Sequence, residues 1–242
     1  MKIELHSIKV GACSTCALGV VLCLALPVLG QDSLWRSYNE NAYKARSAGQ
    51  YAEAQKLFQL AIKEAERFKA PDARLAVSLN GLALALDEEG KSEGVEELFK
   101  RALDINERVF GENHPEVATI LNNLALVYQD QGMYARAEPL LKRALTINEK
   151  SLGQDHASVG TNLHNLAFLY KSQGHYDQAE PLFRRALVIA EETAGPDDPT
   201  IATTLDSLAG IYLAQGSFDQ AEPLYKKGLA IREQTLGLHH PD

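Results

Sequence analysis

The most reactive side chains of this sequence lie near its N-terminus. Cys13, Cys16 and Cys23 are its three cysteines, and Cys13-x-x-Cys16 has the spacing of a redox-active dithiol. All three fall in a stretch, residues 10–30, that carries no charge and follows a basic start. Such a stretch is typical of a secretory signal peptide. Because cleavage would remove every thiol, thiol and redox chemistry are not expected in the mature chain.

Small residues at Val28 and Gly30 suit a signal-peptidase site before Gln31. We therefore predict a signal peptide over residues 1–30 and an exported protein, periplasmic or secreted. The alternative is an uncleaved membrane anchor formed by residues 10–30, because an uncharged segment of this length can just span a bilayer. In that case alone would the chain contact a membrane.

Other reactive groups are few and have no partners at useful spacing. His239-His240 could bind a metal ion, but no cysteine or carboxylate stands at a ligand spacing from the pair. No nucleophile–base pair or phosphate-binding glycine loop is recognisable. The formal net charge of -8, without a basic run, argues against a nucleic-acid partner. We expect no enzyme activity, no cofactor and no metal.

A repeated unit organises the rest of the chain. Glycines recur 42 residues apart at Gly90, Gly132, Gly174 and Gly216, and Gly49 leads the series at a distance of 41 residues. Self-similarity at this period is typical of a solenoid, in which each unit packs against its neighbours. Such proteins usually present a long surface rather than a catalytic cleft.

Each unit contains two amphipathic helical patterns around its glycine. In the third unit, apolar residues recur at helical spacing on both sides of Gly132. They are Leu121, Leu124, Ala125 and Tyr128 before it, and Ala137, Leu140, Leu141, Ala144 and Leu145 after it. The sequence therefore predicts an all-α, right-handed α-solenoid of about five antiparallel helix pairs over residues 31–242. The expected repeats are about 35–76, 77–118, 119–160, 161–202 and 203–242.

This pattern resembles the tetratricopeptide repeat, through Leu124-Ala125, Tyr128, Gly132, Tyr134 and Ala137 of the third unit. The 42-residue form with LNNLA and AEPLxxRAL resembles the repeats of kinesin light chains and their bacterial relatives, and the likely counterpart here is an exported one by its N-terminus. The usual family period is about 34 residues. Glutamates occupy the slot of the family's closing proline, which predicts that the second helix runs on; they are Glu107, Glu149, Glu191 and Glu233.

The resemblance implies that the first helix of each pair lines a concave groove. The groove residues predicted to bind a partner are Asn80, Leu84, Asn122, Asn123, Leu126, Asn165 and Phe168. An asparagine offers both a donor and an acceptor, so a row of them can hold an extended peptide backbone. The resemblance implies that role for Asn123 and Asn165, with the apolar residues forming a floor for an anchoring side chain. The alternative is that the asparagines are only solvated and the apolar residues pack on neighbouring helices.

These features predict a non-catalytic scaffold that binds a protein or peptide in its groove. Acidic residues outnumber basic ones there, so an acidic peptide is disfavoured. One alternative is the N-terminal repeat region of a longer protein with a C-terminal caspase-like peptidase or other effector domain. Another is a self-assembling envelope protein. The segment after Gly237 reads as the start of a sixth helix, which predicts self-association through an open C-terminal end.

Overall fold

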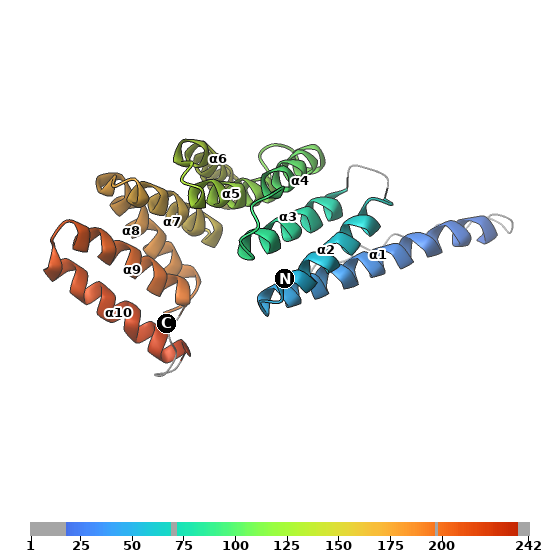
Figure 1. Cartoon of the computed structure of the whole chain (residues 1–242). Helices are drawn as coiled ribbons and strands as arrows, with labels where there is room; N and C mark the ends of the chain where they lie inside the picture. Colours follow the sequence, from blue (N-terminus) through green and yellow to red (C-terminus); the bar gives the residue numbers. More distant parts are fainter. Residues whose placement is uncertain (1–17, 69–71, 197, 237–242) are drawn as a thin grey trace.

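The computed structural model describes residues 18–68, 72–196 and 198–236, and it leaves the side chains of residues 18–31 undescribed. In these ranges the chain forms ten α-helices in five consecutive pairs (Figure 1). The pairs are α1 (Leu18–Ser47) with α2 (Tyr51–Ala65), α3 (Ala73–Glu88) with α4 (Val95–Phe110), α5 (Pro115–Asp130) with α6 (Tyr134–Leu152), α7 (Ala157–Ser172) with α8 (Tyr176–Thr193), and α9 (Pro199–Ala214) with α10 (Phe218–Leu236). The predicted all-α solenoid is confirmed.

The pairs follow one another along an arch, with the first and last pairs at its two ends (Figure 1). Each helix packs against the one before it and the one after it. Each odd-numbered helix also approaches the next odd-numbered helix, whereas no even-numbered helix of the described chain approaches another as closely. Closer packing on one layer bends a stack towards that layer. The odd-numbered helices therefore form the inner side of the curve.

Glycines make the turns inside each pair, as the sequence predicts. Gly49, Gly90, Gly132, Gly174 and Gly216 all have positive φ, between 71° and 80°. A side chain in this left-handed conformation costs about 1–2 kcal/mol, which explains the regular use of glycine.

The starts of the inner helices are capped by side chains. The imidazole Nδ1 of His114 accepts a hydrogen bond from the backbone N–H of Glu116, and His156 caps α7 in the same way through Ser158. Asp198 caps α9 through the N–H of Thr200. Each first helix begins near Ala73 plus a multiple of 42, four residues before the boundaries expected from the sequence. The repeated histidines are therefore helix caps.

The N-terminal expectations lie partly outside the described residues. Residues 1–17 are not described, and residues 18–30 belong to α1, which continues without a break into the first repeat. The signal peptide and the alternative anchor therefore stay predictions. The missing residue between Phe68 and Ala73, which predicted an irregular first junction, coincides with the undescribed residues 69–71. The start of a sixth helix after Gly237 also lies outside the described residues.

The core is a continuous layer of small and large apolar side chains between the helices. Phe58, Phe99, Leu141 and Phe183 occupy one position of successive second helices, and each is fully buried. Alanines line the close approaches, as at Ala125 and its repeats. Because each large side chain contacts the pair that follows, the repeats share one hydrophobic core and stabilise one another.

Ion pairs connect neighbouring second helices across the outer layer. Glu107 pairs with Arg143 at 2.7 Å, and Glu149 pairs with Arg185 at 2.6 Å. Glu191 and Lys227 repeat the arrangement at 2.6 Å. All of these side chains are partly exposed, so each pair contributes at most about 1 kcal/mol. The pairs nevertheless fix the register of successive repeats.

Gly81 is the closest approach of backbone to side chain in the second repeat. A Cβ built there would lie 2.2 Å from Cε1 of the buried Phe58 ring. We expect Gly81→Ala to destabilise the protein by about 1–2 kcal/mol through overpacking. Urea unfolding followed by circular dichroism measures this. Gly160→Ala is the control, because its Cβ would meet the nearest side chain, Ile189, at 3.1 Å. Equal destabilisation by both variants would contradict the packing argument.

Candidate partner-binding groove

The seven residues predicted for the groove all lie on inner helices. Asn80 and Leu84 belong to α3, and Asn165 and Phe168 belong to α7. The remaining three, on α5, are Asn122, Asn123 and Leu126. The structure thus brings them to three consecutive helices of the concave layer. It does not test whether they bind a partner.

The asparagines hydrogen-bond to one another between repeats. The Asn123 side-chain amide donates to the carbonyl oxygen of Asn80 at 2.9 Å, and Asn165 donates to Asn122 at the same distance. Each bond joins residues 43 apart, so it spans two neighbouring inner helices. Asn123 and Asn165 are half-buried, and their own side-chain oxygens have no partner among the described residues. These two oxygens are free to accept a bond from a bound chain.

Asn122 has a different position from its neighbour Asn123. It is 8% exposed, and its carbonyl oxygen accepts a second bond from Asn162 at 3.2 Å. Asn162 in turn accepts from Asn148 of α6 at 2.7 Å. A chain of buried amides therefore crosses the junction of α5, α6 and α7. Sequence reasoning grouped Asn122 with the groove and did not foresee this internal network.

The apolar groove residues differ in exposure. Leu84 is half-buried and packs against the core, and Leu126 is half-buried as well. Phe168 is 41% exposed, which is unusual for an aromatic ring in a packed helix layer. Lys171 lies one turn further along α7, with its ammonium 5.8 Å from the centre of the Phe168 ring. Phe168 is therefore the apolar side chain of this set most accessible to a partner.

Carboxylates dominate the charge near the C-terminal ends of α3 and α5. Burial raises the pKa of Asp87, and the nearby Asp130 and Glu88 raise it further. Glu88 is also paired with Arg46 at 2.9 Å. Like charges held this close favour a cationic neighbour, which agrees with the expectation that an acidic peptide is disfavoured.

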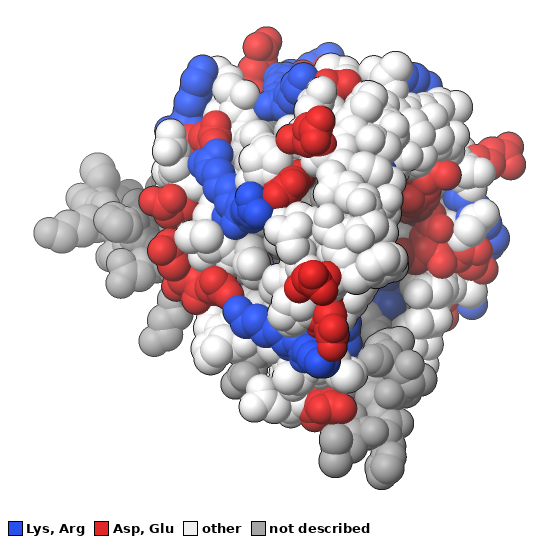
Figure 2. Space-filling model, turned by 90° about the vertical axis from the view of Figure 1, so that its left-hand side faces the viewer, with Lys and Arg blue, Asp and Glu red and all other residues white. Residues whose placement is uncertain are grey.

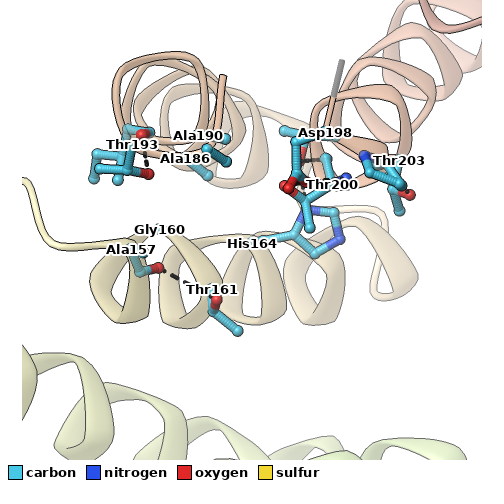
Figure 3. A pocket seen from close by; sticks show the side chains of 14 residues that line it. Ala157, Gly160, Thr161, His164, Ala186, Ala190, Thr193, Asp198, Thr200 and Thr203 are labelled. Atoms are coloured by element: carbon cyan, nitrogen blue, oxygen red, sulfur yellow. Dashed lines mark hydrogen bonds between the residues drawn. The ribbon is translucent and has the colours of Figure 1, made fainter. Parts of the chain in front are cut away.

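A pocket that sequence reasoning missed lies at the junction of α7, α8 and α9. We call it the junction pocket (Figure 3). It has a volume of about 420 Å³ and is lined by the start of α7, the end of α8 and the start of α9. Its lining includes Gly160, His164, Ala190, Ala194, Asp198 and Thr204. A signal was present in the sequence, because three of these residues are smaller than their equivalents in neighbouring repeats.

Two searches of the described residues found no candidates. No group of three or more histidine, cysteine, aspartate or glutamate side chains within them is placed to hold a metal ion. None of the described helices combines the length and apolarity that crossing a bilayer requires.

These features define the class of the protein, an α-solenoid of paired helices with a concave inner layer. The tetratricopeptide repeat family model matches residues 36–107, 95–150, 116–187 and 158–234. The chain therefore belongs to the tetratricopeptide repeat family. No match was found among curated proteins.

Solved structures show the same architecture. BtubC (BKLC) from P. vanneervenii is 25% identical with a TM-score of 0.70, and the match covers 90% of this chain and 94% of that one. A candidate kinesin light chain of P. anserina with nearly identical TPR-like repeats is 26% identical with a TM-score of 0.68, covering 83% and 95%. The resemblance to kinesin light chain repeats is thereby confirmed.

A third similar structure belongs to a longer protein. It is a Rap protein complexed with competence and sporulation factor, 18% identical with a TM-score of 0.72. The match covers 83% of this chain and 54% of the Rap protein. At this identity the likeness concerns the fold alone.

Proposed function

We propose that the chain is a non-catalytic scaffold that binds a segment of a partner protein along its concave groove. The observation that carries this proposal is the pair of free side-chain oxygens on Asn123 and Asn165, half-buried on adjacent inner helices beside the exposed Phe168. An extended peptide brings a row of backbone N–H groups, which need such acceptors. The inter-repeat bonds from these asparagines orient both amides before any partner arrives.

The charge of the groove supports a neutral or basic segment. Asp87, Glu88 and Asp130 lie close enough for the last two to raise the pKa of the first. A lysine or arginine of the partner near these carboxylates would relieve their repulsion, whereas an acidic segment would add to it. Affinity for a basic segment is then expected to fall as salt is raised.

The double variant Asn123→Ala with Asn165→Ala tests the proposal. We expect it to weaken partner binding by about 1–3 kcal/mol, because the bound backbone loses two acceptors. The partner is first captured with chain 31–242 and identified by mass spectrometry, and its affinity is then measured by titration calorimetry.

The matched control changes two exposed polar residues of the outer layer, Thr146→Ala with Glu192→Ala. It should bind the partner like the wild type. Unchanged affinity in the groove variant, with unchanged circular dichroism, would remove the groove from the proposal. The caspase-like alternative attaches the same groove to an effector domain, and the reading frame after Asp242 distinguishes it from a free scaffold.

A further inference from the structure

The junction pocket exists because one repeat uses smaller side chains than its neighbours. Gly160, Ala190 and Ala194 line it. One repeat earlier, the equivalent residues are Ala118, Asn148 and Leu152, and one repeat later they are Ala202, Arg232 and Leu236. At the earlier junction the amide chain from Asn148 fills the space, and at the later one Arg232 pairs with Asp206. The fourth repeat lacks both fillings, so a cavity of about 420 Å³ remains.

The pocket has the size and walls of a small-molecule site. Such sites typically enclose about 300–1,000 Å³ and have mainly apolar walls with a few polar groups. Here Ile189, Ala186 and the small residues of α8 form the apolar wall, and α9 faces them with polar side chains (Figure 3).

The threonine hydroxyls that line the pocket have all spent their protons. Thr161, Thr193, Thr203 and Thr204 each donate to the backbone carbonyl of the residue four positions earlier, at 2.7–3.3 Å. The hydroxyl of Thr200 donates to Asp198 at 2.6 Å. A hydroxyl has a single proton, so each of these oxygens can only accept a further bond.

His164 is in the same condition. Its Nδ1 lies 3.0 Å from the Thr204 hydroxyl oxygen. Because that hydroxyl already donates to the carbonyl of Thr200, Nδ1 must carry the proton and Nε2 the lone pair. Burial, and to a lesser degree the charge of Lys171, lowers the pKa of His164 to about 4. The ring is therefore neutral near pH 7 and adds an acceptor without a positive charge.

Asp198 supplies the formal charge. One of its carboxylate oxygens caps α9 by accepting from the N–H and the hydroxyl of Thr200, and the other has no partner among the described residues. The side chains of the pocket thus offer hydroxyl lone pairs, one imidazole nitrogen and one carboxylate oxygen. A ligand that suits them must bring the donors itself.

We propose that the junction pocket binds a small free molecule with a compact apolar body and a protonated amine. The apolar body fills the space that Asn148 and Leu152 fill in the previous repeat, and the ammonium donates to the acceptors around Asp198. This site is separate from the groove asparagines, so it stands independently of the proposed function.

Titration calorimetry with 2-phenylethylamine as the probe tests the proposal. Phenylacetate and 2-phenylethanol have nearly the same shape but carry a negative charge and no charge. We expect the amine to bind roughly tenfold more tightly than the alcohol, as for one added charge-assisted hydrogen bond, and the acid not to bind. Binding of phenylacetate as tight as that of the amine, or no binding of the amine, would overturn the proposal.

Two variants locate the site. Ala194→Leu introduces the residue that the neighbouring repeats have at this position, so the fold is expected to tolerate it while the pocket fills and amine binding is lost. Asp198→Asn keeps a side-chain oxygen to cap α9 but removes the charge, so the preference for amine over alcohol should disappear. Retained amine binding in Ala194→Leu, or a retained preference in Asp198→Asn, would show that the amine binds elsewhere.

Discussion

Phe183→Ala should destabilise the protein by about 3–5 kcal/mol. The Phe183 ring is fully buried among the inner helices of its own and the following repeat, and it meets the ring of His164 edge-on at 5.1 Å between centroids. Removing it leaves a cavity at a junction that already contains the neighbouring junction pocket. Urea unfolding of chain 31–242 measures the loss, and hydrogen exchange in α7 and α9 shows whether these two repeats open first.

The chain provides a matched control 42 residues later. Tyr225 occupies the same position in the last repeat but is 38% exposed, because no further helix of the described chain covers it. Tyr225→Ala should cost no more than about 1 kcal/mol. Phe218 and Leu229 are more exposed still, on the side of the molecule that Figure 2 shows, where uncharged surface lies between charged side chains. Similar losses for Phe183 and Tyr225 would contradict the account of how successive repeats bury this position.

Asn122→Ala should destabilise the protein by about 2–4 kcal/mol. The carbonyl oxygen of Asn122 accepts from both Asn162 and Asn165, so the substitution leaves two donors without an acceptor. Asn162 is 3% exposed and cannot turn to water, and each such loss costs about 1–3 kcal/mol. Chemical unfolding monitored by circular dichroism gives the value.

The neighbouring asparagine is the control for this prediction. Asn123 is half-buried and donates one bond to Asn80, so Asn123→Ala should cost about 1 kcal/mol or less. If Asn122→Ala were as mild as Asn123→Ala, the buried amide chain would not contribute to the coupling of repeats. The pair of variants also separates the two roles of this face, because Asn123 and not Asn122 is the residue assigned to partner binding.

The outer-layer glutamates show how far a repeat pattern carries. Their recurrence at the slot of the family's closing proline predicted a longer second helix, and α6, α8 and α10 do run through it. Their partners were not foreseen. Glu107 and Glu149 reach arginines of the following repeat, 36 residues away. A period identifies equivalent residues, but which side chains meet across a junction depends on the rotation and rise between repeats.

The sequence by itself determined the fold class, the turns and the inner helices. A glycine every 42 residues and apolar residues at helical spacing admit one solution, because positive φ and amphipathic periodicity are local requirements that hold in any context. The same periodicity placed Asn80, Asn123, Asn165 and Phe168 on the concave layer.

The tertiary structure alone decided which of these residues face inward and where space remains. Asn122 and Asn123 are adjacent in sequence, yet the packing of α5 against α7 buries the first and leaves the second half-exposed. The junction pocket depends on three substitutions that are 4 to 30 residues apart in sequence and converge between α7 and α8. Burial and cavity volume are sums over all neighbours of a side chain, and only the assembled solenoid brings those neighbours together.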